Sequence, residues 1–533
     1  MNIKEENIIL EHIYGNREYQ RRVLTISCLI WGLLDVFSLS LGLLELKPIA
    51  DVFDAKKQLV FHGPLPYDYC ENANFTYVIT EQSHHSLVNS FEIYCNKYLV
   101  ALIGSFNFLG VLIGTLISPF IIDHFGRRNP IIIAVGIYSV FIFLSTFSQN
   151  IQVMFIYVFL CGFTNLISHI AVFLLLNEVT RKEKRSMYSS IIFNSFAMFG
   201  IVFVWAFYYF QNWKSVFYLI SIAAILLCFL CHVFIKESPR FLLLKKDTHF
   251  REKMLRRIFN YGKEVEYFAE MFEEKTKRRL LYLLDREEDD HLAKLRETLI
   301  DKTSEESEIC KKIFQGITSK DKFEDSKDNE CERSILKEPT KQKSFFVLIG
   351  NSNIKYTFFT MCFIWFCISG SYYGILIMAK DIKGDVYMTY TMMYTLEIFS
   401  NIIASIMMEH PELGRRNSIS ILFLLAISLL LCKIFFDFSN YMVIFLAGLR
   451  FLISIIYSII YVYCIESYPT DIRAKGLAFN AVFGRFSSIL VPFIVEILQE
   501  RFFVLVVIIF SISFCLSFLL KETYNTELEQ YTK

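Results

Sequence analysis

Long apolar segments separated by short polar loops dominate this sequence. Twelve of them are long enough to cross the roughly 30 Å hydrocarbon core of a bilayer, which takes about 20 helical residues. They begin near Val23, Leu99, Pro130, Ile151, Met187, Val216, Tyr356, Val386, Ser418, Tyr441, Gly476 and Phe502. Because backbone polar groups in lipid must be satisfied within the segment, the pattern predicts an all-α membrane protein with twelve transmembrane helices.

Basic residues gather in loops on one side of the predicted membrane. They are Arg21 and Arg22, Arg127 and Arg128, Arg181 to Arg185, Arg415 and Arg416, and Arg473 and Lys475. The positive-inside rule makes that side cytoplasmic, and both termini with it. The predicted organisation is a cytoplasmic N-terminus (1–22), a six-helix half (23–236) with an external loop (46–98), a cytoplasmic central loop (237–344), a second six-helix half (345–520) and a cytoplasmic tail (521–533).

The predicted external loop has features of the secretory route. Cys70 and Cys95 are the only cysteines in a polar stretch that faces an oxidising compartment, and we expect them to form a disulfide. Asn74 opens the sequon Asn-Phe-Thr and is a candidate glycosylation site on the correct side.

Composition supports the membrane assignment and narrows the function. Of the 533 residues, 54% are hydrophobic and 16% aromatic, which leaves too little polar surface for a soluble protein of this size. The net charge of +1 provides no field that would attract nucleic acid. No nucleotide-binding loop, metal-ligand spacing or Ser, His and Asp cluster is evident, so we expect no cofactor, no metal and no enzymatic activity.

Two parts of the chain repeat one another. Gly126-Arg127-Arg128 after the second segment recurs as Gly414-Arg415-Arg416 after the eighth. Glu178 and Arg185 after the fourth segment recur, with the same spacing, as Glu466 and Arg473 after the tenth. This pattern predicts two six-helix halves of like orientation, related by an axis along the membrane normal.

The repeated charges lie at the cytoplasmic ends of the segments. They can pair between helices of one half, close that face, and separate when the face opens; the alternative is that they are ordinary positive-inside flanks. Gly110 and Gly114 would let two helix backbones approach closely. The candidate gating residues are Gly110, Gly114, Asp123, Gly126, Arg127, Arg128, Glu178, Arg185, Glu237, Arg240, Gly414, Arg415, Arg416, Glu466 and Arg473.

Several motifs occur in a recognisable order. They are FLGVLIGTLIS ahead of Asp123, Glu237-Ser-Pro-Arg240, Trp365-Phe366, Tyr372-Tyr373-Gly374, Gly384-Asp385-Val-Tyr387 and YVYCIESYPTDIRAKG. In this order the chain resembles the major facilitator superfamily and, within it, the organic ion transporter family of organic cation, organic anion and carnitine carriers. The resemblance implies a substrate site between two six-helix halves and transport by alternating access.

Four charged residues lie inside the predicted spans. At about 1.5 Å per residue, Arg485 lies some 14 Å into its segment, near the bilayer midplane. Asp35, Glu397 and Arg450 lie near the same level. Mutual neutralisation is one explanation, with Glu397 paired to Arg450 or to Arg485. The resembled family has a basic residue at the position of Arg485 in its anion and carnitine branches, which implies a carboxylate-bearing substrate there.

Further residues are candidates for the same site. Trp365, Phe366, Tyr372 and Tyr373 would either line it or serve in packing. Asn165 and His169 are one helical turn apart and share a face. Asp35 would carry a coupling proton or cation, or would be a hydrogen-bonded neutral acid.

The sequence therefore predicts a secondary-active or facilitative transporter of organic anions or zwitterions, such as carnitine-like compounds, in the plasma membrane. The expected partners are a small organic ion, the bilayer and a co- or counter-transported ion. One alternative is an organic cation transporter or a sugar porter of the same fold. Another is a non-transporting sensor or scaffold.

Overall fold

The computed structural model describes residues 17–54, 56–71, 75–80, 84–180, 182–238, 241, 352–381, 385–436, 441–468 and 473–523. The chain divides into two compact units, which we describe separately. The smaller unit contains residues 1–22, 176–185 and 237–342, and the larger contains 23–175, 186–236 and 343–533. Asn74, Arg240 and nearly all of the predicted central loop lie outside the described residues, as do the side chains of Arg185 and Arg473.

The helices begin close to the predicted segments. The first half contains α2 (Arg17–Leu33), α3 (Val36–Leu39), α4 (Leu41–Leu44), α6 (Leu87–Ser90), α7 (Lys97–Phe125), α8 (Arg128–Ser145), α9 (Ile151–Val179), α10 (Lys182–Phe210) and α11 (Trp213–Phe234). The second contains α20 (Ser352–Met378), the 3₁₀ turn η1 (Ala379–Asp381), α21 (Val386–Glu409), α22 (Arg416–Phe435), α23 (Met442–Ser467), α24 (Arg473–Leu498), η3 (Gln499–Arg501) and α25 (Phe502–Ser517).

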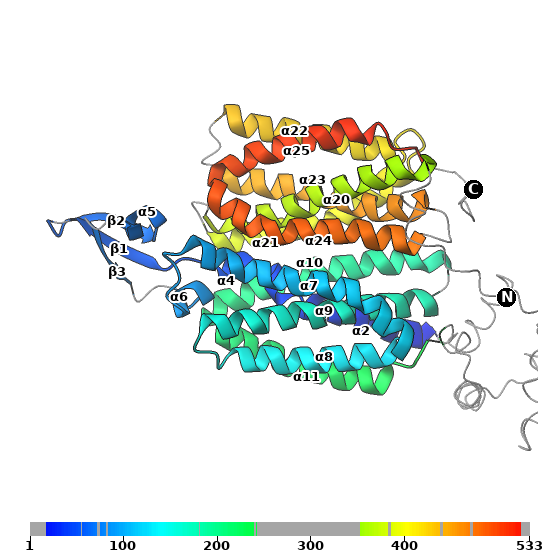
Figure 1. Cartoon of the computed structure of the whole chain (residues 1–533), viewed down its shortest axis with the longest axis horizontal. Helices are drawn as coiled ribbons and strands as arrows, with labels where there is room; N and C mark the ends of the chain where they lie inside the picture. The colour runs from blue at the N-terminus through cyan, green and yellow to red at the C-terminus, as the bar shows by residue number, and fades with distance from the viewer. Residues whose placement is uncertain are drawn as a thin grey trace, which may run out of the picture. The chain divides into compact units, whose positions relative to one another are not determined.

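The long helices of the larger unit lie side by side (Figure 1), and their packing repeats between the halves. In the first half α8 packs against α11, and in the second half α22 packs against α25. These are the third and sixth segments of each half, so equivalent positions pair as the repeat predicts. Helix α7 packs along α24 and joins the two halves.

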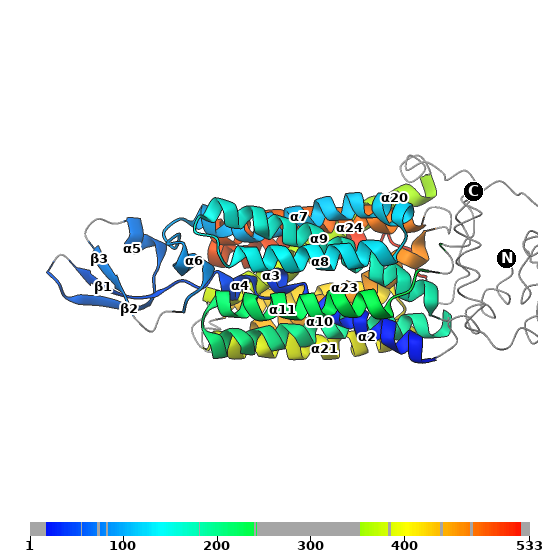
Figure 2. The ribbon, with the colours of Figure 1, turned by 90° about the horizontal axis from the view of Figure 1, so that it is seen from below.

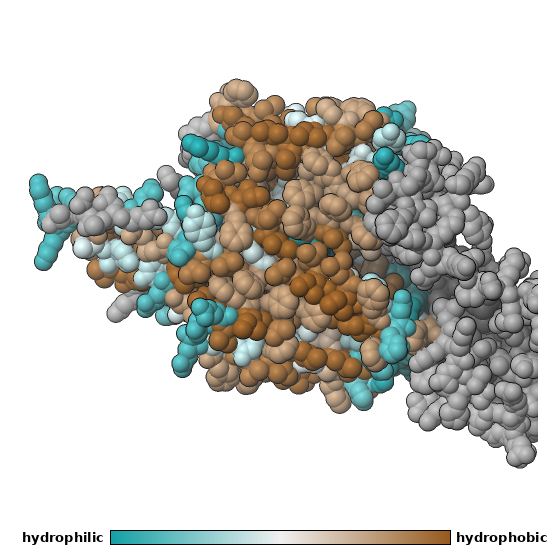
Figure 3. Space-filling model, in the orientation of Figure 1, coloured by the Kyte–Doolittle hydropathy of each residue, from teal (hydrophilic) through white to brown (hydrophobic). Residues whose placement is uncertain are grey.

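The outer surface of the helices is apolar, as lipid contact requires. Figure 3 shows a hydrophobic band across the visible face, with hydrophilic residues at its two ends. Phe120, Phe229 and Ile406 are among the large apolar side chains on the surface. Within the described ranges, nine helices, α7 to α11 and α20 to α23, are long and apolar enough to cross a membrane.

Glycines allow α7 and α9 to pack with their backbones in contact. A Cβ atom on Gly110 would lie 2.1 Å from the Phe159 carbonyl oxygen, and one on Gly114 would lie 2.9 Å from that of Phe163. Both distances are shorter than any real Cβ contact, so only glycine fits. The close approach predicted from these two residues is therefore present.

A small antiparallel sheet projects from one end of the helices, which we call the sheet end (Figure 2). Strand β1 (Ile49–Asp54) lies between β2 (Leu59–Pro64) and β3 (Phe75–Ile79), and α5 (Tyr67–Glu71) packs beside them. The predicted disulfide between Cys70 and Cys95 is present. This bond links α5 to Cys95, two residues before the start of α7. The all-α prediction omitted this sheet.

Candidate functional site

A cavity of about 100 Å³ lies between the two halves within the larger unit. The lining residues are Trp31, Asp35, Ser38, Val111, Asn165, Leu166, His169, Phe193, Phe196, Tyr372, Tyr373, Glu397, Asn401, Tyr457, Ser458, Tyr461 and Arg485. Seven of the ten residues proposed for substrate binding are among them. Arg450, Trp365 and Phe366 are not.

Arg450 is fully buried and neutralises Glu397. Its Nη2 atom lies 2.9 Å from Glu397 Oε2, and its Nη1 atom donates to the Tyr372 carbonyl oxygen at 3.1 Å. The Tyr372 hydroxyl donates to the other Glu397 oxygen at 2.6 Å, and the guanidinium lies 3.9 Å from the Tyr372 ring centroid. Since each charge in this group has its partner, the pair fits the neutralisation alternative.

Arg485 lies on the cavity wall and has a different environment. Its Nη1 atom lies 3.5 Å from the Tyr373 hydroxyl. Among the residues that the structure describes, no carboxylate forms an ion pair with it. This guanidinium is half-buried and loses part of its hydration without gaining an anion, so the side chain is suited to bind an anion that enters the cavity.

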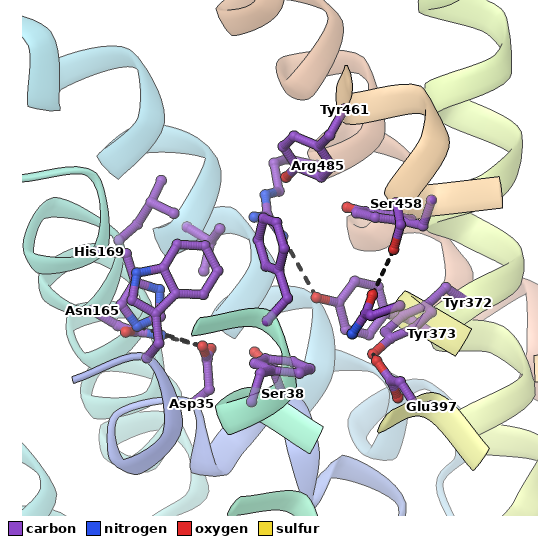
Figure 4. A pocket seen from close by; sticks show the side chains of 17 residues that line it. Asp35, Ser38, Asn165, His169, Tyr372, Tyr373, Glu397, Ser458, Tyr461 and Arg485 are labelled. Carbon is purple, nitrogen blue, oxygen red and sulfur yellow. Dashed lines mark hydrogen bonds and ion pairs between the residues drawn. The ribbon is translucent and has the colours of Figure 1, made fainter. Parts of the chain in front are cut away.

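Asp35 lies at a break in the first span, where α2 has ended and α3 has not begun. It is the N-cap residue of α3 but makes no side-chain capping bond, which leaves its carboxylate for other partners. Asn165 Nδ2 donates to Oδ1 at 2.8 Å, and His169 Nε2 lies 3.5 Å from Oδ2. The Trp31 ring stacks on His169 at 4.7 Å. Figure 4 shows Asp35, Asn165 and His169 on one side of the cavity and Tyr372, Tyr373 and Glu397 on the other.

Aromatic rings form much of the remaining wall. Tyr457 and Tyr461, one turn apart on α23, line the cavity. Trp365 lies behind them, with its ring 4.6 Å from that of Tyr461 and 5.6 Å from that of Tyr457. It therefore positions the lining tyrosines. Phe366 is half-buried and does not line the cavity.

The repeated Gly-Arg-Arg motif makes a similar contact in both halves. Gly126 has φ +89° and Gly414 has φ +61°, a region that favours glycine. Arg128 donates to the Ile235 and His232 carbonyl oxygens at the end of α11, at 2.8 and 2.9 Å. Arg416 donates to the Phe518 carbonyl oxygen at the end of α25, at 3.3 Å. Each arginine thus caps the last helix of its own half.

Charged pairs surround the motif in the second half. Arg415 lies 3.1 Å from Glu466, and Glu466 also accepts a hydrogen bond from Thr523 at 2.6 Å. Glu522 accepts from the backbone N–H groups of Arg415 and Arg416, where the N-terminus of α22 favours a carboxylate. In the first half, Arg127 lies 4.0 Å from Asp123, whose side chain is largely exposed.

Each of the remaining predicted gating pairs includes a side chain outside the described residues. Glu178 lies in the last turn of α9, and Arg185 lies in α10 with its side chain outside the described part. Glu237 accepts a hydrogen bond from the Ser238 backbone N–H at 2.8 Å, and its proposed partner Arg240 is outside the described ranges. The pairings of Glu178 with Arg185, Glu237 with Arg240 and Glu466 with Arg473 stay predictions.

The fold agrees with comparisons to known proteins. The sequence profile of the Major Facilitator Superfamily matches residues 90–492. This chain belongs to the major facilitator superfamily. Membership of this superfamily and the long apolar helices together indicate a multi-pass membrane protein.

Two structures of this superfamily support the same fold. The xylose transporter XylE from E. coli, inward open, aligns over 97% of this chain and 98% of its own at 13% identity, with TM-score 0.53. XylE bound to 6-bromo-6-deoxy-D-glucose aligns over the same shares at 14%, with TM-score 0.57.

Several curated proteins that are similar to this chain are named as organic cation/carnitine transporters or as members of solute carrier family 22. The rat organic cation/carnitine transporter 2 is 25% identical over 417 residues, which cover 77% of this chain and 64% of the relative. The human organic cation/carnitine transporter 2 is 24% identical, covering 83% and 70%. Solute carrier family 22 member 15 of Xenopus tropicalis is 23% identical, covering 88% and 76%. The chain thus spans a little under two thirds of the rat relative. The resemblance to the organic ion transporter family is confirmed.

Sequence reasoning missed several residues that line this cavity. Tyr457 and Tyr461 follow the i, i+4 spacing of a helix face, a signal that was available. Asn401 and Ser458 form a hydrogen bond at 2.6 Å, and Asn401 also donates to Asn194 of the first half at 2.6 Å. Their sequence positions alone do not indicate which helices face each other.

Proposed function

We propose that this chain is a secondary-active or facilitative transporter that carries organic anions or zwitterions by alternating access. The cavity between the two halves is the substrate site, and Arg485 binds a carboxylate of the substrate. One observation carries this assignment: Arg485 lines the cavity without an acidic partner among the described residues, whereas Arg450 is neutralised by Glu397. A guanidinium and a carboxylate form a strong, charge-assisted pair in such a site.

The other cavity residues have complementary roles in this proposal. Tyr372, Tyr373, Tyr457 and Tyr461 offer ring faces and hydroxyl groups to an amphipathic substrate. Asp35, held by Asn165 and His169, contributes a negative charge opposite Arg485, which suits a substrate or coupled ion with a positive group. Glu397 on the cavity wall and Arg450 behind it hold α21, α23 and α20 together.

The proposed topology has twelve spans and cytoplasmic termini in the plasma membrane. Three further spans bring the nine apolar helices to twelve. They are the segment formed by α2, α3 and α4, the helix α24 and the helix α25. Basic residues at the end opposite the sheet place that end in the cytoplasm. The sheet end is then external, and the domain boundaries follow those predicted from the sequence, with Asn74 as a glycosylation site. The charged pairs at the cytoplasmic end, including Arg415 with Glu466, close that face.

A second candidate is transport of organic cations. It is favoured by Asp35, which faces a cavity whose rings at Trp31, Tyr457 and Tyr461 can attract a positive charge. In that case Arg485 would not contact the substrate. The names of the relatives include both cation and carnitine transport, so the two candidates require a direct test.

Uptake measurements distinguish these candidates. Cells expressing the protein at their surface receive a panel of labelled organic anions, organic cations, zwitterions and sugars, with uptake normalised to surface protein. We expect carboxylate-bearing compounds to accumulate, and their uptake to fall in Arg485→Ala. Cation uptake that survives Arg485→Ala would support the second candidate, sugar uptake would identify a porter, and no uptake of any compound would support a sensor or scaffold.

A further inference from the structure

A second group of charged residues is buried at the sheet end, away from the substrate cavity. Lys380, in η1 after α20, donates to Glu45 Oε2 at 2.8 Å and is also paired with Glu496 on α24. The exposed fractions of the Lys380, Glu45 and Glu496 side chains are 1%, 1% and 5%. Burying an ion pair costs desolvation free energy that the attraction between its charges only partly repays. Apolar side chains would fill the same space without that cost, so the three charges call for another explanation.

The group connects the two halves of the facilitator. Glu45 follows α4 in the first half, whereas Lys380 and Glu496 both belong to the second half. The contact between Lys380 and Glu496 therefore stays inside one half, and the contact between Glu45 and Lys380 crosses between halves. Among the residues that the structure describes, none forms a hydrogen bond with the second, buried oxygen of Glu45. Within that part of the chain, Lys380 is thus the partner that attaches the Glu45 carboxylate to the other half.

The projecting sheet contributes a second crossing contact. Tyr67 on α5 donates its hydroxyl hydrogen to Glu496 Oε2 at 2.9 Å. Burial raises the pKa of Tyr67 well above its usual value, so the hydroxyl keeps the proton that it donates. Lys47 covers the other side of this contact, with its Nζ atom 3.6 Å from the Tyr67 ring centroid. Cys70, on the same short helix, is bonded to Cys95 next to the start of α7.

Other contacts between the halves lie towards the same end. Ser105 of α7 donates to the Ile489 carbonyl oxygen of α24 at 2.8 Å. The Tyr394 hydroxyl of α21 donates to the Leu39 carbonyl oxygen of α3. These uncharged contacts can slide or exchange with water at moderate cost. Opening the contact between Glu45 and Lys380 instead separates opposite charges, which costs more than breaking either uncharged contact.

We propose that Glu45, Lys380, Glu496 and Tyr67 form the outer gate of the transport cycle, and that the disulfide-linked sheet holds this gate closed through Tyr67. The inference rests on the alternating access of the proposed function but not on the identity of the substrate. When the sheet end opens, Glu45 and Tyr67 leave with the first half, and Lys380 keeps Glu496 as its partner. That division lets the gate open without leaving Lys380 unpaired.

Accessibility of the cavity tests the gate without any substrate. Val111→Cys places a thiol on the cavity wall, and an impermeant methanethiosulfonate reagent is applied to cells from outside. Labelling in the same protein without Val111→Cys supplies the blank for the native cysteines. Glu45→Gln and Tyr67→Phe each remove one crossing contact, while Lys380 remains paired with Glu496. We expect each to raise the labelling rate roughly fivefold, and the double variant to raise it further.

Matched controls separate a gate from a general loss of structure. Glu92→Gln changes an exposed acid and Tyr69→Phe changes a second tyrosine of α5, and neither residue is part of the cluster. Both should label at the wild-type rate. Brief reduction of surface protein by an impermeant phosphine, washed out before labelling, should act in the same direction as Tyr67→Phe. Equal labelling of Glu45→Gln, Tyr67→Phe and the controls would overturn the gate, and an unchanged rate after reduction would overturn the role of the sheet.

Faster labelling with no uptake of any compound would support the gate and reject the proposed transport. Normal carboxylate uptake with unchanged labelling would support the proposed transport and reject the gate.

Discussion

Two arginines inside the membrane have opposite environments. Arg450 has no exposed surface and makes contacts with Glu397 and with the carbonyl oxygen and ring of Tyr372. Arg485 lies on the cavity wall near a tyrosine hydroxyl. The contacts of Arg450 stabilise the packing of three helices, whereas the guanidinium of Arg485 has N–H groups that can bind a ligand. We therefore expect substitutions of these two residues to have different consequences.

Arg450→Ala should destabilise the protein by about 3 to 5 kcal/mol, because it leaves Glu397 buried without its counter-charge. The double variant Arg450→Met with Glu397→Gln removes both charges at similar volume and should recover most of that loss. Thermal unfolding of the purified protein in detergent measures both. Equal destabilisation in the single and double variants would show that the charge pair is not the reason.

The residue level of the site was only partly predictable. The sequence indicated that Asp35, Glu397, Arg450 and Arg485 share a depth, because depth follows from position along a helix. It left open which acid pairs with which base, since pairing depends on how each helix is rotated. Trp365 was placed with the lining residues for the same reason, whereas the structure places it behind Tyr457 and Tyr461.

At the scale of elements, the contact of α7 with α9 depends on glycine. Gly110→Ala should destabilise the protein by about 1 to 3 kcal/mol, because the added methyl group would overlap the Phe159 backbone. Gly448→Ala is a matched control, since the nearest atom to its new Cβ would be 3.9 Å away. Surface expression and thermal unfolding measure the difference. Similar behaviour of the two variants would contradict the close packing.

The disulfide supports the sheet rather than the helices. Cys70→Ser with Cys95→Ser opens a loop with a sequence separation of 25 residues, and should lower the stability of the sheet by about 3 kcal/mol. Limited proteolysis from outside the cell should then cut between residues 46 and 98, while the unfolding temperature of the helices changes little. An uncut sheet in the double variant would contradict this division.

Other elements could not be recognised from the sequence. Strand β1 alternates buried Ala50 and Val52 with less buried neighbours in the structure, which is the period of a strand. Its sequence, Ile-Ala-Asp-Val-Phe-Asp, does not alternate apolar and polar residues throughout, so it gives no clear strand signal. The break between α2 and α3 is hidden for a different reason, because the apolar pattern continues across it and gives no sign that the helix ends.

At the scale of the whole molecule, the repeat was predicted in most detail. Arg128 and Arg416 cap the last helices of their halves, as equivalent positions should. The sheet end and its charged group have no counterpart in the repeat and were not predicted from it. Contacts between Glu45 and Lys380 join residues far apart in the chain, and no local pattern indicates them.

The proposed orientation predicts modification at the sheet end and protection of the termini. Asn74→Gln should abolish a mobility shift on glycosidase treatment of the wild-type protein. Epitope tags at either terminus should bind antibody only after the cells are permeabilised. Tags accessible on intact cells would reverse the topology and with it the assignment of the outer gate.

The role of Arg485 is tested most directly by a cycle of two changes, one in the protein and one in the substrate. Uptake into proteoliposomes is measured for a carboxylate substrate from the panel and for its primary amide, with wild-type protein, Arg485→Ala and the exposed control Arg501→Ala. We predict that the wild type and the control prefer the carboxylate in kcat/KM roughly tenfold to hundredfold, and that Arg485→Ala loses this preference. An equal preference in all three proteins would contradict the binding of the carboxylate by Arg485.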